Sequence, residues 1–371
     1  MPEAVSIAPA VPDSLKLELL STPVGVLGTG DGGGVELTVR DVAAEMLRRG
    51  HQVEVVAPAG SALAGIPVRE VGGNLQSAAQ SRDGGAAICM PANPVLGNMW
   101  AQARALQPAC DLLVNFAFDW LPFYLTPFFQ RSIAHFLSMG SMQNALDPVA
   151  AQVAERFPGT VGVYTASQAA TFPFAAHCRC LGSGIDLAQY RFCAQPDAAL
   201  GWVGRIAPEK GLEDAIAAAQ QAGMPLRIWG KIQDEAYWQG VCRQYPDAPF
   251  EYRGFLATEA LQAQLRRCQG LLVTPRWLEA FGNVAIEALA CGVPVIAYWR
   301  GGPSEIVRHG RTGYLVEPDR VAGLVEGIQA LGHLDRRACR QQAEAEYSRE
   351  ALGDRFEAWF RQLTERTTSS P

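Results

Sequence analysis

Short apolar runs alternate with helical patterns along almost the whole chain, and this alternation constrains the fold more than any other feature. An apolar run at residues 17–20 is followed by a helical pattern over residues 35–49 and a second run over residues 51–56. A strand, a helix and another strand in this order form a βαβ unit, in which the strands are parallel. The same half predicts further strands over residues 112–116, 132–137 and 161–164, and helices near 98–107 and 147–156.

The second half of the chain repeats the alternation. It predicts strands over residues 200–203, 226–229, 250–252, 270–273 and 295–297, and helices over 212–222, 235–245, 258–267 and 283–290. A polar stretch over residues 189–197 separates the two halves, and residues 336–367 have a helical pattern. We therefore predict an α/β protein with two doubly wound, Rossmann-like domains. The first covers residues 1–190 and is completed by a C-terminal helix at about 350–371, and the second covers residues 191–349.

Length and composition agree with two packed domains. The chain has 371 residues, of which 49% are hydrophobic and 18% charged, so it can bury two cores. A formal net charge of −6 argues against a nucleic-acid partner. The first 16 residues lack the features of a signal peptide, which predicts a short disordered lead, and no apolar run is long enough to span a membrane. Nine scattered cysteines indicate reduced thiols, so we expect a cytoplasmic protein without disulfides or a metal centre.

A glycine-rich loop connects the first strand to the first helix. It contains Gly32, Gly33 and Gly34, which would let backbone N–H groups approach an anion at the helix N-terminus. Two alternatives are a flexible loop without a ligand and a dinucleotide site. The dinucleotide site would need an acidic residue at the tip of the second strand, where the sequence has Pro58 and Gly60.

A second loop, over residues 204–211, carries two cations after a predicted strand. Arg205 and Lys210 flank a turn that contains Pro208, and Lys210 is one of only three lysines in the chain. The guanidinium can bind two oxygens at once and the ammonium supplies a point charge, so the pair suits a diphosphate. A solvated turn is the alternative interpretation.

The segment over residues 275–295 is the most specific motif. Glu279 precedes a predicted helix, and Glu287 lies eight positions later within it. A carboxylate before the helix can accept hydrogen bonds from sugar hydroxyls, and the first N–H groups of the helix can bind phosphate. Glu287 would be costly to bury without a partner, and a ribose diol could provide one. Pairing of Glu287 with a neighbouring arginine is the alternative.

Together these motifs resemble the retaining family-4 glycosyltransferases, which have the GT-B fold and are also grouped as glycosyl transferases group 1. The ordered set covers nearly the whole chain: the glycine-rich loop, residues 49–53, residues 184–186, the turn at 204–211, the pair Glu279 and Glu287, and residues 301–316. The resemblance implies donor-binding roles for Gly32, Gly33, Gly34, Gly204, Arg205, Lys210, Glu279, Phe281, Gly282, Asn283, Val284 and Glu287.

The resemblance also implies a mechanism. Arg205 and Lys210 would neutralise the donor diphosphate, Glu279 would bind the sugar and Glu287 the ribose. His135 would lie near the reacting face of the sugar, although Phe136 follows it where many members have Asp. The expected reaction is a front-face transfer that retains configuration and needs no metal or other cofactor. The donor is expected to be UDP-glucose, and the sequence does not fix the oligomeric state.

An aromatic segment over residues 116–129 concerns the acceptor. We expect Trp120, Phe123 and Tyr124 to form a wall for a small, soluble, partly aromatic acceptor, with a pteridine as an example. Core packing would use the same residues. Three other functions stay open: transfer to a lipid or polysaccharide at a membrane surface, binding of a nucleotide sugar without catalysis, and, more distantly, an NAD(P)-dependent oxidoreductase. The complete set Arg205, Lys210, Glu279 and Glu287 argues against binding without catalysis. The scarcity of lysine argues against the membrane surface.

Overall fold

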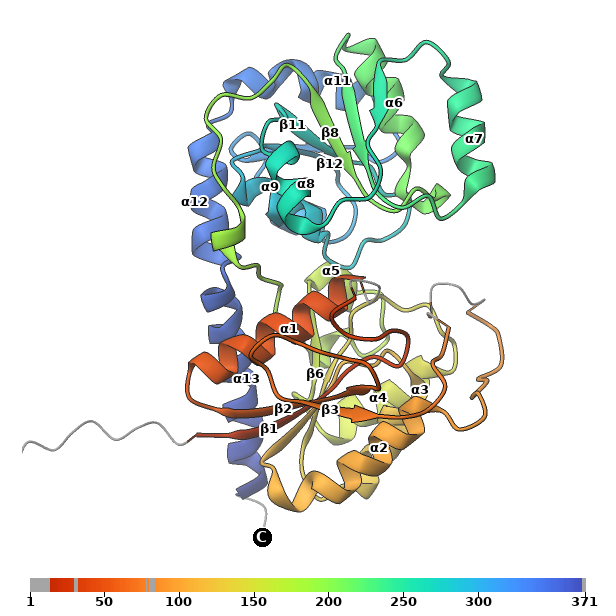
Figure 1. The fold of residues 1–371 in the computed structure, drawn as a ribbon, viewed down its shortest axis with the longest axis vertical. Coiled ribbons are helices and arrows are strands. Elements are labelled where there is room, and N and C mark those ends of the chain that lie inside the picture. Colours follow the sequence, from red (N-terminus) through yellow and green to blue (C-terminus); the bar gives the residue numbers. More distant parts are fainter. Residues whose placement is uncertain (1–13, 30–32, 78, 80–83, 369–371) are drawn as a thin grey trace, which may run out of the picture.

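The computed structural model describes residues 14–29, 33–77, 79 and 84–368. These residues form two lobes, and each lobe is built on one parallel sheet flanked by helices (Figure 1). The predicted α/β class with two doubly wound domains is confirmed. Residues 1–13 of the predicted N-terminal lead and Gly32 of the glycine-rich loop lie outside the described residues, whereas Lys16, the last residue of that lead, begins the first strand.

Seven strands form the sheet of the first lobe, in the order β3-β2-β1-β4-β5-β6-β7. Neighbouring strands are parallel, and apolar residues such as Leu19 and Val55 pair in register at its centre. The elements of this lobe are β1 (Lys16–Leu20), α1 (Gly33–Arg48), β2 (Gln52–Pro58), β3 (Val68–Val71), α2 (Val95–Leu106), β4 (Leu112–Asn115), α3 (Trp120–Leu125), β5 (Ile133–Phe136), α4 (Leu146–Arg156), β6 (Val161–Val163), α5 (Ala166–Ala169) and β7 (Cys178–Cys180).

Six strands form the sheet of the second lobe, in the order β10-β9-β8-β11-β12-β13. Its central strands, such as β11, are buried along their whole length, which explains why they are continuous apolar runs in the sequence. The elements are β8 (Leu200–Val203), α6 (Leu212–Gln221), β9 (Leu226–Trp229), α7 (Glu235–Gln244), β10 (Phe250–Tyr252), α8 (Thr258–Leu265), β11 (Gly270–Val273), α9 (Asn283–Ala290), β12 (Val295–Tyr298), α10 (Pro303–Ile306), β13 (Gly313–Val316) and α11 (Val321–Ala330).

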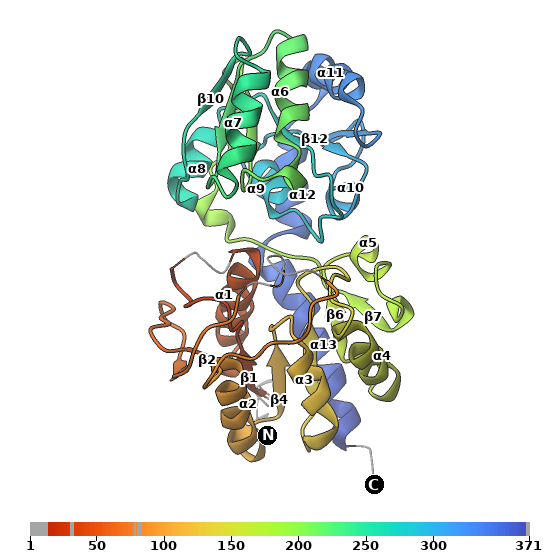
Figure 2. The same cartoon turned by 90° about the vertical axis from the view of Figure 1, so that its right-hand side faces the viewer.

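The C-terminal segment, which has a helical pattern over residues 336–367, forms two helices. α12 (Arg336–Glu346) lies beside the second lobe, and α13 (Arg349–Thr368) runs along the first lobe (Figures 1 and 2). The break occurs where the Ile185 N–H donates to the Tyr347 carbonyl at 2.9 Å and the Ser348 hydroxyl accepts the Ala351 N–H at 3.1 Å. α13 packs against α1, so the last helix completes the first lobe as expected. The boundary at residue 190 stays a prediction.

The order of the strands determines where a ligand can bind. In each sheet the connections reverse direction at one point, between β1 and β4 in the first lobe and between β8 and β11 in the second. Ligands of open α/β sheets bind outside the carboxyl ends of the strands at such a point. The loops after these four strands are therefore the first place to look for a site.

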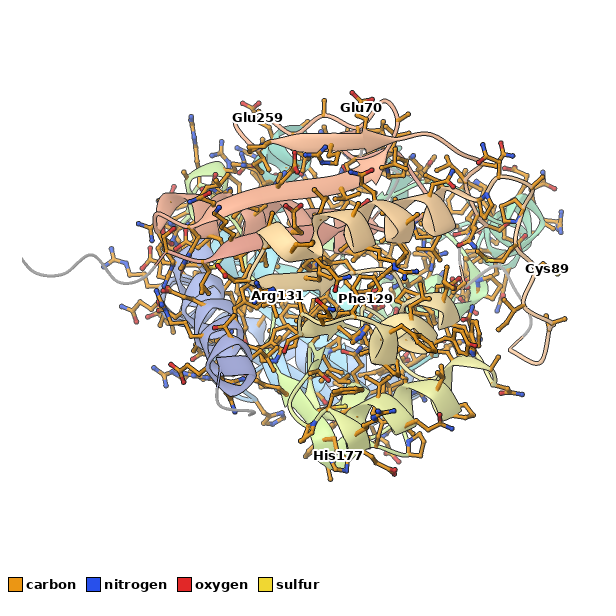
Figure 3. All side chains as sticks on the ribbon, turned by 90° about the horizontal axis from the view of Figure 1, so that it is seen from below. Glu70, Cys89, Phe129, Arg131, His177 and Glu259 are labelled. Atoms are coloured by element: carbon orange, nitrogen blue, oxygen red, sulfur yellow. The ribbon has the colours of Figure 1, made fainter. Side chains whose placement is uncertain are left out.

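Two further findings concern membrane-spanning helices and disulfides. None of the helices in the described part of the chain is long and apolar enough to cross a membrane. All nine cysteines are free, and Figure 3 shows Cys89 on the loop between β3 and α2, where it is exposed. The structure therefore does not depend on disulfides.

Candidate active site

A cleft of about 590 Å³ separates the two lobes, and loops at the carboxyl ends of both sheets line it. The first lobe contributes residues after β1, β4 and β5, including Thr22, Phe118 and Met139. The second lobe contributes residues after β8 and β11, including Arg205 and Glu279. The cleft therefore lies between the two doubly wound lobes, at both topological switch points.

The N-termini of two helices from different lobes meet at this cleft. α1 begins at Gly33, α9 begins at Asn283, and a Cβ atom on Gly34 would lie only 2.9 Å from Nδ2 of Asn283. Only glycine therefore fits at position 34 without moving the amide. No described side chain caps the start of α9, which Gly282 precedes. Both helix ends carry partial positive charge, so together they favour an anion in the cleft.

Charged side chains from the second lobe gather at the same end of the cleft. Lys210 forms an ion pair with Glu279, and about one-fifth of each side chain is exposed. The turn that carries Lys210 ends at Gly211, which has φ = +61° and lies against the Thr274 carbonyl. Arg205 pairs with Glu209 at 3.0 Å and donates to the Gln233 amide oxygen.

Burial alone would raise the pKa of Glu279, but Lys210 reverses this effect. The nearby ammonium, its hydrogen bond and a further hydrogen bond from Trp277 hold the pKa of Glu279 below its usual value. Glu279 is therefore ionised at neutral pH. It can accept hydrogen bonds from hydroxyl groups that enter the cleft.

Glu287 lies one turn after Asn283 on α9, outside the set of residues that line the cleft. Burial raises its pKa to about 7, and a hydrogen bond with Tyr190 acts in the opposite direction. The hydrogen-bond partner of Glu287 is thus Tyr190, from the segment between the lobes, and not an arginine as in the alternative interpretation. Phe281, Gly282 and Val284 line the cleft with Gly204, and their donor-binding roles stay predictions.

His135 does not lie at the cleft, so its predicted place beside the sugar needs correction. Its side chain is fully buried, and its ring stacks on Phe123 with 4.2 Å between centroids. Nδ1 accepts from the Asn115 amide at 3.3 Å, and Nε2 lies 2.9 Å from the Thr126 hydroxyl oxygen. Because that hydroxyl already donates to the Pro122 carbonyl, it accepts from Nε2. Both ring nitrogens are thus satisfied by the core, and burial lowers the pKa of His135 to about 3.

The predicted aromatic wall for the acceptor is also absent from the cleft lining. Phe123 is fully buried against His135, while Trp120 and Tyr124 stack on each other with 4.4 Å between ring centroids. Tyr124 and Phe123 line a separate hollow of about 390 Å³ between α3 and α4. α3, whose start Asp119 caps by accepting the Leu121 N–H at 3.0 Å, contributes no side chain to the cleft lining. Phe118 is the aromatic residue of this segment that lines the cleft.

Several lining residues were not proposed from the sequence. The loop after β5 contributes Met139 and Gln143, and the loop after β3 contributes Gln76. These three could have been proposed from their position after a strand, but residue type alone gives no signal. Trp277 also lines the cleft, and it lies within the motif at 275–295, although no role was proposed for it. Lys231, the remaining lysine of this lobe, lies 4.9 Å from the centre of the Phe255 ring. Among the described residues, no three His, Cys, Asp or Glu side chains form a group that could hold a metal ion.

Comparison with known proteins identifies the second lobe. Residues 194–349 match the family model for glycosyl transferases group 1. The second half of the chain belongs to this glycosyltransferase family. The matched residues include Arg205, Lys210 and Glu279, so the charged end of the cleft is part of the family domain.

Relatives of the glycosyltransferase domain differ in how much of the chain they cover. D-inositol 3-phosphate glycosyltransferase of Rhodococcus erythropolis is 26% identical, covering 89% of this chain and 85% of its own length. Glycogen synthase of Mycobacterium tuberculosis is 34% identical over 200 residues, which are 50% of this chain. The chain spans only 46% of that glycogen synthase, about half of its length.

Solved structures share both lobes of the fold. HepE from Anabaena in complex with UDP superimposes with a TM-score of 0.75 and 19% identity, covering 94% of this chain and all of HepE. Sucrose-phosphate synthase from Thermosynechococcus elongatus gives a TM-score of 0.74 and 21% identity, covering 95% of this chain and all of that one. At this identity the likeness shows the fold, which is the two-domain GT-B fold.

Proposed function

We propose that this chain transfers a sugar from a nucleotide diphosphate donor to a small, partly aromatic acceptor. The observation that carries the proposal is the charge arrangement at one end of the cleft. Arg205, Lys210 and the uncapped start of α9 face a cleft that is large enough for a ligand. Two cations and free N–H groups at one point match the charge of a diphosphate.

A UDP-linked hexose, with glucose as the first choice, is the donor that we propose. The solved structures of HepE that share this fold include a complex with UDP and glucose. The family match to the second lobe leaves the oxidoreductase alternative without support. Glu279 would bind the sugar hydroxyls, and Glu287 would accept from the ribose once the donor extends along α9.

The proposed reaction retains the configuration of the sugar and uses no metal or other cofactor. The bond between the anomeric carbon and the β-phosphate oxygen breaks, and the acceptor oxygen bonds to the same face of that carbon. The proton of the acceptor hydroxyl moves to the departing phosphate oxygen. Arg205, Lys210 and the helix N-terminus stabilise the negative charge that develops on the diphosphate, so the protein acts mainly by positioning and electrostatics.

The first-lobe side of the cleft suggests the class of acceptor. Phe118, Met139 and Met142 supply apolar and polarisable surface, while Gln76 and Gln143 supply amide groups. Such a lining suits a flat molecule with a ring and hydrogen-bonding edges, of which a pteridine is an example. In this proposal these lining residues bind the acceptor, in place of Trp120 and Tyr124, which the sequence had suggested.

One observation favours a second candidate, transfer at a membrane surface. Tyr124 and Phe128 are 47% and 64% exposed beside the hollow between α3 and α4. Exposed aromatic side chains of this kind also occur where proteins contact lipid interfaces. Sedimentation with vesicles would separate the candidates, because the first predicts full activity without lipid.

A screen of nucleotide sugars tests the proposed function directly. Purified protein is incubated with UDP-glucose, other UDP-hexoses and GDP- or ADP-linked sugars, and release of the nucleotide diphosphate is measured. We expect slow hydrolysis of at least one UDP-sugar and thermal protection by UDP. If no nucleotide sugar is hydrolysed and none protects the fold, the proposal is wrong.

A further inference from the structure

Trp277 contacts all three charged groups at the donor end of the cleft. Its indole N–H donates to Oε2 of Glu279 at 3.1 Å. The ammonium nitrogen of Lys210 lies 5.0 Å from the ring centroid, and the guanidinium carbon of Arg205 lies 6.0 Å from it. Trp277 itself lines the cleft, between the end of β11 and the start of α9. One side chain thus holds an anion by its N–H group and two cations by its ring.

The charged groups at this end of the cleft form ion pairs with one another or with neighbouring residues. Lys210 and Glu279 form an ion pair, so a diphosphate must draw the ammonium away from the carboxylate. Glu279 then loses its strongest partner at the moment when it must meet the sugar hydroxyls. Without another contact, both side chains would gain freedom as the pair opens, and ordering them again would cost binding energy.

The two contacts of the indole persist through this exchange. A hydrogen bond from the indole N–H continues to orient Glu279 after Lys210 has moved to the phosphate. The ring attracts the ammonium wherever it lies over the face, and such a contact is worth about 0.5–2 kcal/mol. Trp277 is therefore placed to keep Lys210 and Glu279 ordered both before and after the donor binds.

We propose that Trp277 is a positioning residue that holds Lys210, Arg205 and Glu279 in register while the Lys210–Glu279 pair opens to admit the donor. This inference rests on the proposed function, because it needs a diphosphate to compete for Lys210. The roles of the aromatic face and of the N–H group of the indole can be tested separately. A phenylalanine at position 277 keeps an aromatic face but has no N–H, whereas a leucine removes both.

The experiment compares W277F and W277L with the wild type in UDP binding by calorimetry and in hydrolysis of the UDP-sugar found by the screen. W277F should bind UDP within about twofold of the wild type and hydrolyse the donor about tenfold more slowly. Its acidic limb in the pH profile of hydrolysis should move to higher pH, because Glu279 has lost a hydrogen bond that lowers its pKa. W277L should in addition bind UDP about tenfold more weakly.

Charged groups around Glu279 stay the same in these variants. Lys210 and Arg205, both from the turn after β8, are the charged groups that act on the Glu279 carboxylate. A merely structural tryptophan would change stability without moving the pH profile. The matched controls are W299F and W299L, because Trp299 is 67% exposed and lies outside the cleft lining.

Three results would overturn the inference. One is that both Trp277 variants behave like the Trp299 controls, and another is that W277F weakens UDP binding as much as W277L does. The third is a slower W277F whose pH profile is unchanged. If W277L does not fold, the hydrolysis rate of W277F and the pH profile of that rate test the inference by themselves. If the wild type neither binds UDP nor hydrolyses a nucleotide sugar, the proposed function itself fails, and the inference fails with it.

Discussion

Replacing His135 by glutamine should change how the stability of the protein depends on pH. The imidazole is fully buried, and burial holds its pKa at about 3 instead of 6.5. Above pH 6.5 the imidazole is neutral in both the folded and the unfolded chain. As pH falls below 6.5 the unfolded chain binds a proton that the folded chain does not bind until about pH 3. Stability is therefore lost as pH falls through this window.

The magnitude follows from the two pKa values. Between pH 7 and pH 5, uptake of this proton by the unfolded chain removes about 2 kcal/mol of unfolding free energy. Glutamine does not titrate, so H135Q lacks this loss, whatever its repacking costs at both pH values. Glu18 acts in the opposite direction in both proteins and cancels in the comparison, because burial raises its pKa to about 7.

Urea unfolding followed by circular dichroism at pH 7 and pH 5 measures this difference. The wild type should lose about 2 kcal/mol more than H135Q on acidification. Hydrolysis of the donor per folded molecule should be unchanged in H135Q, because His135 does not line the cleft. Equal acid sensitivity of the two proteins, or a selective loss of hydrolysis in H135Q, would show that His135 faces a ligand or solvent and would refute the assignment to the core.

Three further predictions concern other parts of the molecule. Burial raises the pKa of Glu18 to about 7, so ionising this carboxyl costs the folded chain stability as pH rises from 5 to 8. The stability of E18Q relative to the wild type should therefore increase by about 2 kcal/mol from pH 5 to pH 8, and a difference that is the same at both pH values in thermal melts would contradict this. Donor hydrolysis should survive EDTA, whereas loss with EDTA and recovery with Mg²⁺ or Mn²⁺ would show that a metal is needed. F118A should raise the acceptor KM about tenfold and W120A should leave it unchanged, because Phe118 lines the cleft and Trp120 does not. The reverse pattern in steady-state kinetics would show that Trp120, and not Phe118, binds the acceptor.

Strands of the second lobe could be located from the sequence almost to the residue. β8 and β11 are buried runs of apolar residues, and burial of both faces leaves no polar residue to blur their ends. β3, by contrast, escaped the sequence analysis. Its four residues, Val68–Val71, include the adjacent charged residues Arg69 and Glu70, and none of the four is fully buried. A short edge strand of this kind has too weak a pattern to separate from a loop.

Non-local contacts explain why the sequence analysis misplaced His135 and missed Trp277. His135 lies in a strand as predicted, one residue before the end of β5, but its hydrogen-bond partners Asn115 and Thr126 come from other elements. The sequence around His135 does not indicate that the side chains of Asn115 and Thr126 point toward the imidazole. Arg205 and Lys210, in contrast, could be placed because a turn after a strand in a parallel sheet must open at the ligand-binding edge. Trp277 was missed because its role depends on three side chains brought together only by the fold.

Calorimetric titration of UDP into the wild type, R205A and K210A tests the central claim most directly. Both side chains line the cleft, and a hydrogen bond to a charged group is worth about 1.5–3 kcal/mol, so each variant should bind UDP at least about tenfold more weakly. Exposed cations of the first lobe, Lys16 and Arg104, provide the matched controls K16A and R104A. We expect the controls to bind UDP like the wild type and all five proteins to melt at similar temperatures. Unchanged UDP affinity in both R205A and K210A would contradict the assignment of this cleft as a nucleotide sugar site.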